Sequence, residues 1–240
     1  MNNQPVSHRY MTLTVTIALL MILSPLLKRS PATAGAALLL FLVMSVAALW
    51  SVTRSRMAFY TGLLVVVIAF TSSVPRYLRL DWGPVAWPLH VVGLVFYALF
   101  CGLVIWGILR QMWLDFAVTL DTLFGGICVY LLLGLMWEFL YHLTVYLFPG
   151  SLLQNGQPLT AGPETFDLLL YFSFMTMTTV GYGDVVPAGD VARFLAVVQS
   201  VVGQLYLIIL IGGLVAIRTS APRPPQPAPD PKSPLKISDQ

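Results

Sequence analysis

Long runs of apolar residues make up most of the chain, and short polar segments separate them. A helix that crosses a bilayer needs roughly 20 mostly apolar residues, so each long run is a candidate span. Six runs meet this length: Tyr10–Leu27, Ala32–Val52, Met57–Val74, Val85–Leu109, Ala117–Phe148 and Asp190–Ile217. The pattern therefore predicts an all-α membrane protein with six transmembrane helices. A signal peptide is the other interpretation of the first run, but that run has no clear cleavage site of small residues and another apolar run follows at once.

The interval between the fifth and sixth runs departs from this pattern. Residues Pro149–Gly162 are polar and contain three glycines and two prolines, which predicts a connector. Residues Pro163–Met177 predict a helix, because proline suits its first position and two acids, Glu164 and Asp167, lie at its positive N-terminal end. That helix is too short to cross a bilayer, so we expect it to be re-entrant or buried between the neighbouring spans.

The composition supports a membrane protein. Of the 240 residues, 58% are hydrophobic and only 10% are charged, whereas soluble domains average about 25% charged residues. The formal net charge of +3 is too small to suggest a nucleic-acid partner. The two cysteines, Cys101 and Cys128, lie inside apolar runs, so neither a disulfide framework nor a cysteine metal site is expected. No set of catalytic residues is evident, and we expect neither an enzyme nor a cofactor.

The distribution of basic residues indicates an orientation. An even number of spans places both termini on one side of the membrane. If that side is the cytoplasm, eight basic residues lie on it and five lie on the other side, which agrees with the positive-inside rule. We therefore expect a multi-pass protein of the plasma or inner membrane with cytoplasmic N- and C-termini.

The segment Thr178–Asp184, with the sequence TTVGYGD, follows the expected short helix and carries the candidate chemistry. Irregular backbone is tolerated at membrane depth only where it is buried in protein or lines a watery cavity. Gly181 and Gly183 alternate with larger residues, so alternate positions can take a positive φ. Such an alternation would turn successive carbonyl groups toward one side, where a ring of them can replace the hydration shell of a monovalent cation.

This segment resembles the selectivity filter of the potassium-channel family at all seven positions: Thr178, Thr179, Val180, Gly181, Tyr182, Gly183 and Asp184. The similarity covers about Ala117–Arg218, which corresponds to an outer helix, a pore loop and an inner helix. The resemblance implies that K+ binds to the backbone carbonyls of Thr179, Val180, Gly181 and Tyr182, with the Thr179 hydroxyl at the inner end and Asp184 at the outer mouth. It also implies that the pore loop enters from the extracellular face, which gives the same orientation as the charge distribution.

One filter strand cannot encircle an ion, and the chain contains no second Gly-Tyr-Gly sequence and no internal repeat. A closed pore therefore requires four chains in a ring, and we expect a homotetramer in the lipid bilayer. The predicted function is passive, potassium-selective conduction. Two alternatives stay open: a modulatory subunit that conducts only in heteromers, and a subunit of an ion transporter.

Voltage sensing by the familiar route needs a spanning helix with several basic residues at every third position. The fourth run, Val85–Leu109, contains no lysine or arginine, and Arg110 follows its end. Arg76 and Arg79 have the required spacing, but they are only two and lie between prolines outside the spans. We therefore expect that no Arg-rich helix gates the pore.

The last run contains the gating candidates. Gly203 lies 24 positions after Thr179, where members of the resembled family usually carry a hinge glycine, although a small residue also permits close helix packing. Gln204 and Ser200 lie one turn apart on one face, and polar side chains in a span tend to face the interior or a water-filled cavity. We expect Gln204 to line the vestibule beneath the filter, with Gly212 near a second bending point.

Glu138 and His142 lie one helical turn apart in the fifth run. An intramembrane carboxylate is a functional candidate by default, here bonded behind the filter or acting as a proton sensor with His142. The alternative is a hydrogen-bonded pair at the membrane interface that only anchors the helix. The other histidines, His8 and His90, have no spacing to His142 that indicates a metal site.

The expected short helix differs from the resembled family at two positions. Tyr171 and Phe172 stand where many relatives have tryptophan. Phe172 cannot donate a hydrogen bond to Asp184, so we expect a looser hold on the filter.

Three regions are expected along the chain. Residues 1–113 form a four-span region of unknown role, residues 114–219 form the pore domain, and residues 220–240 form a tail. Residues Ala221–Gln240 contain seven prolines and no aromatic residue, which predicts a disordered, proline-rich cytoplasmic tail. A cytoplasmic partner of this tail is conceivable, but an unstructured end is the simpler interpretation.

Overall fold

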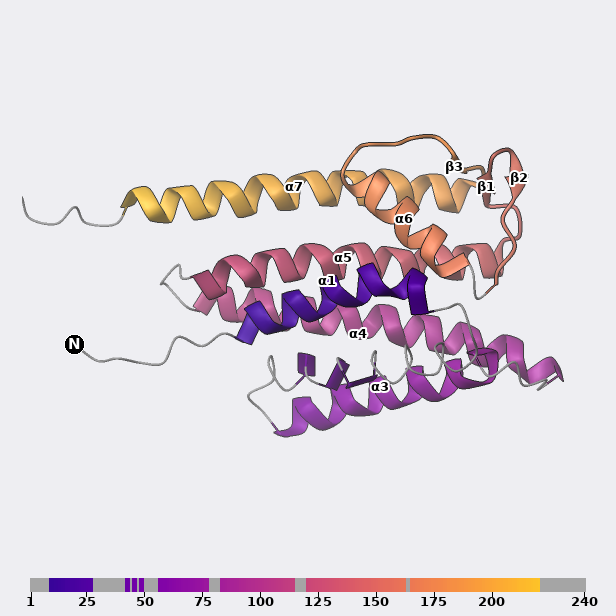
Figure 1. Cartoon of the computed structure of the whole chain (residues 1–240), viewed down its shortest axis with the longest axis horizontal. Coiled ribbons are helices and arrows are strands. Elements are labelled where there is room, and N and C mark those ends of the chain that lie inside the picture. Colours follow the sequence, from indigo (N-terminus) through magenta and orange to yellow (C-terminus); the bar gives the residue numbers. More distant parts are fainter. Residues whose placement is uncertain are drawn as a thin grey trace, which may run out of the picture.

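The computed structural model describes residues 9–27, 42–43, 45–46, 48–49, 56–77, 83–114, 120–162 and 165–220. In these residues the chain is mostly helical (Figure 1). The helices are α1 (Arg9–Leu27), α3 (Arg56–Tyr77), α4 (Ala86–Leu114), α5 (Leu120–Leu147), α6 (Thr165–Met177) and α7 (Asp190–Ser220), with a 3-10 turn, η1 (Gly83–Val85), before α4. The short strands are β1 (Leu152–Gln154), β2 (Gln157–Pro158) and β3 (Val185–Pro187).

Within the described residues, α1, α3, α4, α5 and α7 occur where apolar runs predict spans, and their ends differ from the prediction by a few residues. The six described residues of the second predicted span are also helical. Within the described residues, α4, α5 and α7 include stretches long and apolar enough to cross a membrane, namely Pro88–Leu114, Asp121–Leu147 and Asp190–Leu210. The expected short helix is present as α6. Several expectations concern residues that lie mostly or wholly outside the described part: the second span (Ala32–Val52), the proline-rich tail, Arg79, His8 and Glu164.

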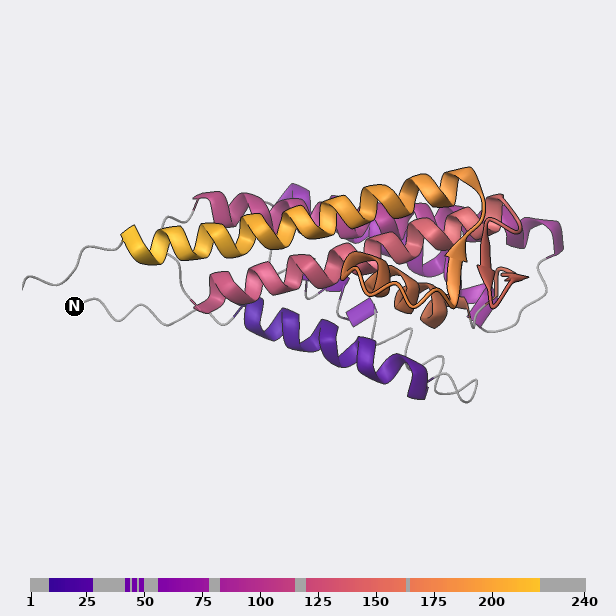
Figure 2. The same ribbon diagram turned by 90° about the horizontal axis from the view of Figure 1, so that it is seen from above.

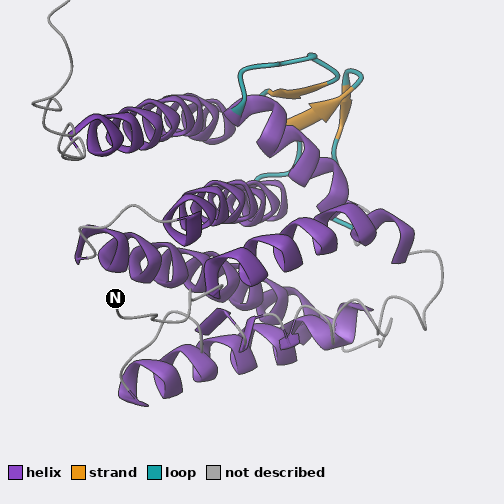
Figure 3. Cartoon of the chain, turned by 60° about the vertical axis from the view of Figure 1, so that its left-hand side comes forward, coloured by secondary structure: helices purple, strands orange, loops and turns teal. Residues whose placement is uncertain are grey.

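The long helices run side by side, and α5 lies at their centre (Figures 1 and 2). It packs against α1, α4, α6 and α7, while α3 packs against α4. The first turn of α1 and the last turn of α7 lie at one end of the molecule, and the strands lie at the other end (Figure 1). The short helix α6 packs against α5 and α7 near the strands, and the segment that follows it forms a loop at the surface of the single chain (Figures 1 and 3).

Hydrogen bonds attach the start of α1 to the neighbouring helices. The Asp121 carboxylate, in the first turn of α5, accepts from the backbone N–H of Tyr10 at 3.0 Å. This bond satisfies one of the amide groups that the first turn of a helix leaves without an intrahelical partner. One turn later, the Thr14 hydroxyl donates to the Phe124 carbonyl of α5 at 2.8 Å. The Tyr10 hydroxyl also donates to the Gln111 side chain of α4, so three helices are joined at this end.

The connector between α5 and α6 and the residues after Asp184 form an antiparallel sheet, drawn in orange in Figure 3. Its strand order is β2-β1-β3, and Leu153 of β1 pairs with Val186 of β3. Leu152 and Val185 are buried, which anchors the sheet on the apolar cluster formed by α5, α6 and α7. Residues 149–162 connect α5 to α6 as expected, but the strands depart from the all-α fold class that the apolar runs predicted. Strands of two or three residues are too short to show an alternating pattern in the sequence.

Candidate functional site

The segment Thr178–Gly183 follows α6 and is exposed in the single chain. Its first four residues stay hydrogen-bonded to the last turn of α6. The bonds run from the N–H of Thr178 to the carbonyl of Phe174 (2.9 Å), from Thr179 to Thr176 (3.1 Å), and from Val180 and Gly181 to Met175 (2.9 and 3.3 Å). The position of this segment is therefore set directly by the position of α6.

The backbone of the segment alternates between the two signs of φ. Thr179, Gly181 and Gly183 have φ values of 60°, 54° and 82°. The prediction that both glycines occupy positive-φ positions is confirmed. The third position is a surprise, because a β-branched residue such as threonine is rarely found at positive φ. A threonine therefore shares the alternation that the sequence assigned to the glycines alone.

Asp184 ends the segment and is held from two sides. The Tyr171 hydroxyl donates to its carboxylate at 3.1 Å, and the backbone N–H of Asn155, in the β1–β2 turn, donates to its carbonyl at 2.8 Å. Desolvation and the neighbouring Asp184 carboxylate raise the pKa of Tyr171, so its hydroxyl stays protonated at neutral pH. The Tyr171 ring also stacks on Tyr182, with centroids 6.4 Å apart and planes 4° apart.

These contacts correct the expectation of a loosely held filter. Phe172 is buried and packs edge-to-face on Tyr141, with centroids 4.9 Å apart, so it does not face Asp184. The residue before it, Tyr171, supplies the hydrogen bond that phenylalanine lacks. The sequence analysis considered the wrong one of two adjacent aromatic residues, because it could not tell which face of α6 points toward the segment.

A buried polar network lies on the other side of α6, and the sequence analysis missed it. The Tyr141 hydroxyl of α5 donates to Gln199 Oε1 of α7 at 2.7 Å. Gln199 Nε2 donates to the Ser173 carbonyl at 2.9 Å and to the Ser173 hydroxyl at 2.8 Å. The Ser173 hydroxyl in turn donates to the Gly134 carbonyl of α5 at 2.8 Å. Tyr141, Ser173 and Gln199 have no exposed surface, so this network joins three helices out of contact with solvent.

The polar residues that the sequence did single out on α7 lie elsewhere on that helix. The Ser200 hydroxyl donates to the Ala196 carbonyl of its own helix at 2.8 Å, and Gln204 is half-buried. One feature of the sequence pointed to Gln199. It lies one turn before Gly203 on the same face of α7, and close helix packing was one of the two interpretations of Gly203. A lining role for Ser200 and Gln204 stays a prediction.

Gly203 packs against the end of α6. A Cβ at Gly203 would lie 2.5 Å from Met177 Cγ and 3.0 Å from the Met177 carbonyl oxygen, so a side chain there would collide with α6. Close packing thus accounts for this glycine, while a hinge role stays a prediction. A Cβ at Gly212 would meet no atom of the chain within 4 Å.

Glu138 and His142 form a hydrogen bond of 3.0 Å within α5, and both are buried. The His142 ring contacts His90 of α4, with centroids 5.6 Å apart, and His90 also contacts Tyr146 at 4.9 Å. His142 therefore faces α4. The structure brings together two histidines whose spacing in sequence gave no hint of contact, but the described residues hold no group of three or more metal-ligating side chains. A sensor role for the pair stays a prediction.

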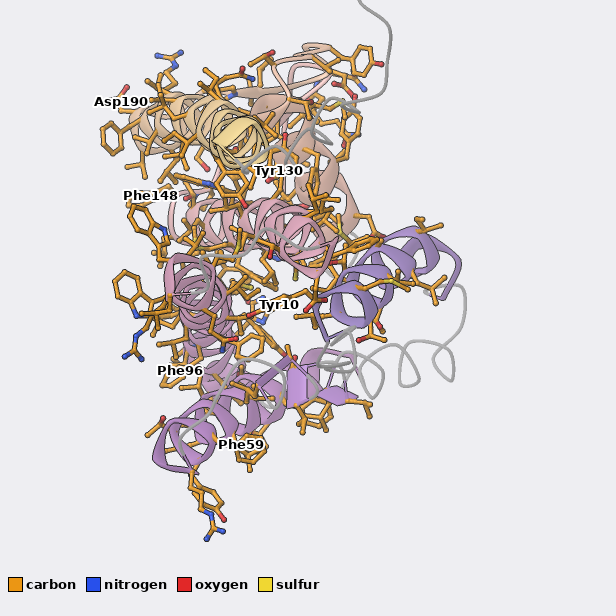
Figure 4. All side chains as sticks on the ribbon, turned by 90° about the vertical axis from the view of Figure 1, so that its left-hand side faces the viewer. Tyr10, Phe59, Phe96, Tyr130, Phe148 and Asp190 are labelled. Atoms are coloured by element: carbon orange, nitrogen blue, oxygen red, sulfur yellow. The ribbon has the colours of Figure 1, made fainter. Side chains whose placement is uncertain are left out.

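The outer face of α7 is largely uncovered, in contrast to α5. In the most apolar window of α5, 61% of the residues are buried, whereas the figure for α7 is 11%. Between the two helices, Tyr130 of α5, labelled in Figure 4, stacks with Tyr206 of α7, and the ring centroids are 6.2 Å apart. The exposed large apolar side chains of α7 are Val191, Phe194, Val197, Val201, Leu205, Ile208 and Ile209, and those of the adjacent segment are Val180 and Tyr182.

Comparison with known proteins gives a match to a family model and a match to a curated protein. Residues 117–219 match a family model described as "Ion channel". Protein LctB of Bacillus caldotenax is 31% identical over 97 residues, which cover 39% of this chain and 70% of that protein. No solved structure gives a significant match. The family match spans α5, α6, the segment Thr178–Asp184 and α7.

Proposed function

Because this chain belongs to the ion-channel family, we propose that four copies of it form a potassium-selective pore. Family membership makes the protein a membrane-resident ion channel rather than an enzyme, which agrees with the absence of catalytic residues expected from the sequence. The ion that passes, the number of subunits and the residues that bind the ion are the content of the proposal.

The segment Thr178–Asp184 supplies the selectivity filter. The observation that carries this assignment is the alternation of positive φ at Thr179, Gly181 and Gly183 in a segment that the single chain leaves exposed. Backbone carbonyls that converge on one axis can replace the water around a dehydrated K+. The binding carbonyls are those of Thr179, Val180, Gly181 and Tyr182, with Thr178, Gly183 and Asp184 completing the filter sequence.

A homotetramer follows from what the chain leaves uncovered. Both the filter and the apolar face of α7 are exposed within the described part of one chain. Four copies arranged around one axis would bring four filters together and cover the α7 faces at the same time. A cyclic arrangement does this with one repeated contact.

In the proposed orientation, both termini of the chain lie in the cytoplasm. The first turn of α1 and the last turn of α7 lie at the same end of the molecule, opposite the sheet that holds Asp184 (Figure 1). With the filter opening outward, the sheet faces the exterior of the plasma or inner membrane. Residues 114–219 are the pore domain, residues 1–113 an N-terminal four-span region and residues 220–240 a cytoplasmic tail.

Gating does not use an Arg-rich helix. No lysine or arginine occurs in α4 before Arg110, which lies exposed near the end of that helix. Gly203 and Gly212 are the candidate bending points of α7, and Ser200 and Gln204 are its candidate lining residues. These assignments do not depend on which stimulus opens the pore.

Purified protein in liposomes provides the test. We expect K+ flux that sets a reversal potential close to the K+ equilibrium value under a K+ gradient, with Na+ passing far more slowly. We also expect a detergent particle with the mass of four chains. A well-folded tetramer without flux would favour the modulatory-subunit alternative, and flux from a monomer or dimer would refute the fourfold pore.

A further inference from the structure

The pore helix α6 touches α7 at two points that lie one turn apart on both helices. Ser173 and Met177 are separated by four residues on α6, and Gln199 and Gly203 are separated by four residues on α7. Gln199 donates two hydrogen bonds to Ser173, and Gly203 accepts the close approach of Met177. The two helices are therefore fixed in one register, because a shift along either axis breaks both contacts.

The same turn of α6 is fixed on its opposite side by α5. The Gly134 carbonyl accepts the Ser173 hydroxyl, and the Phe174 ring occupies the space where a Cβ at Gly134 would be. Tyr141 lies about two turns after Gly134 on α5, and its hydroxyl donates to Gln199. Gln199 thus bonds to both of the other helices, through its amide nitrogen to α6 and through its amide oxygen to α5.

This turn is also the one from which the filter residues take their hydrogen bonds. The carbonyls of Phe174, Met175 and Thr176 accept from Thr178, Thr179, Val180 and Gly181. Ser173 comes directly before these acceptors. A displacement of α6 by a fraction of an ångström at Ser173 is therefore passed on to the carbonyl positions of the proposed filter.

We propose that Gln199 is a positioning residue for ion selectivity. It holds the last turns of α6 at the distance from α7 that gives the filter its ion-binding geometry, and it does so without contacting the ion. This inference rests on the proposed function, because it assigns to Gln199 a part in the selectivity of the same filter. A buried glutamine with all its hydrogen-bonding groups engaged suits this task, since loss of either partner leaves a buried polar group unsatisfied.

The test compares three substitutions in the full-length protein reconstituted in liposomes. Gln199→Met keeps the length of the side chain and removes every hydrogen bond to Ser173 and Tyr141. Tyr141→Phe removes one hydroxyl group from the network and is the milder variant. Thr144→Ala is the matched control, because it removes a buried hydroxyl group of α5 that donates to the Leu140 carbonyl of its own helix.

The readout is the K+/Na+ permeability ratio from reversal potentials, measured on particles with the mass of the wild type. We expect Gln199→Met to lower the ratio about tenfold, which corresponds to about 1.4 kcal/mol, Tyr141→Phe to lower it less, and Thr144→Ala to leave it unchanged. The double variant that combines Gln199→Met with Tyr141→Phe should have the same permeability ratio as Gln199→Met alone, because both substitutions act through one network.

An unchanged ratio in assembled Gln199→Met would overturn the proposal, as would additive losses in the double variant. If Gln199→Met does not assemble, Tyr141→Phe decides the matter by the same measurement. A wild type that conducts K+ and Na+ equally would instead refute the proposed potassium selectivity. In that case the unitary conductance decides for Gln199: a loss in Gln199→Met but not in Thr144→Ala supports positioning, and equal values reject it.

Discussion

The helices α5 and α7 have similar lengths, 28 and 31 residues, and both are apolar enough to cross a membrane, but they differ in what covers them. Within their most apolar windows, α5 is 61% buried and α7 is 11% buried. We call α5 with its neighbours α1, α4 and α6 the closed side, and α7 with residues 178–183 the open side. Apolar composition shows only that a helix lies out of contact with water. Whether lipid, its own chain or another subunit covers it depends on neighbours that hydropathy does not reveal.

The largest effect on K+ flux is expected on the open side, where the backbone conformation of the proposed filter is changed. Gly183 and Gly150 both have a φ of 82°, and a Cβ at either would meet no atom within 4 Å. Alanine at such a position costs about 1–2 kcal/mol of backbone strain in either place. We expect both substitutions to lower the melting temperature similarly, but only Gly183→Ala to reduce K+ flux, by about tenfold or more.

Flux assays and thermal melts on the two alanine variants check this pair. Equal flux from both variants would mean that the geometry at Gly183 has no role in conduction. Gly150, which follows α5 outside the filter, is the control for strain alone.

The next effect distinguishes two kinds of exposed apolar side chain. Leu205 of α7 and Leu103 of α4 are both leucines and both 51% exposed in the single chain. Tryptophan at a packed interface costs about 1–3 kcal/mol, whereas tryptophan that faces lipid finds room. We expect Leu205→Trp to weaken the tetramer and abolish flux, and Leu103→Trp to preserve both, as judged by particle mass in mild detergent. If Leu103→Trp disrupts assembly equally, α4 belongs to the open side as well.

A smaller effect is expected at the outer end of the filter. Tyr171→Phe removes the hydrogen bond to the Asp184 carboxylate but keeps the ring that stacks on Tyr182. A bond to a charged group contributes about 1.5–3 kcal/mol when buried, and less at this partly exposed site. We expect faster decay of sustained K+ current in Tyr171→Phe. Tyr171→Trp restores a donor and should recover the slow decay, and equal decay in all three proteins would exclude the bond as a support of the filter.

The smallest effect on conduction is expected on the closed side. Glu138→Gln keeps a hydrogen-bonding group beside His142 and removes the charge. Because the pair faces His90 on α4, we expect a fall of a few degrees in melting temperature, about 2–4 °C for each kcal/mol, with an unchanged permeability ratio. The ratio and the pH dependence of flux are measured together. A pH dependence in the wild type that Glu138→Gln removes would identify the pair as a proton sensor instead.

The sequence predicted the features that depend on local composition. Apolar runs located the helices, Pro163 and the acids after it indicated α6, and alternating glycines indicated positive φ at Gly181 and Gly183. Each of these follows from the length of a run or from the conformational freedom of one residue. No tertiary contact is needed to infer them.

The features that sequence did not predict depend on how helices are rotated against one another. A helix that is apolar almost all round offers no polar face to fix its rotation. Gln199 could therefore not be distinguished from Ser200 or Gln204, and Tyr171 could not be distinguished from Phe172. The positive φ of Thr179 and the short strands β1 and β3 depend on contacts that only the folded chain provides.

The exposure of residues 178–183 in the single chain also bears on how the protein is made. Backbone groups that lack partners inside a bilayer cost several kcal/mol each, so a newly inserted subunit is a high-energy species until it meets others. Assembly and completion of the ion path then become one concentration-dependent event. In a cell that makes equal amounts of normal and filter-defective subunits, random fourfold mixing would leave on the order of one in sixteen channels entirely normal. In the proposed tetramer, one defective subunit would be enough to inactivate a channel, because all four subunits would contribute to the same ion path.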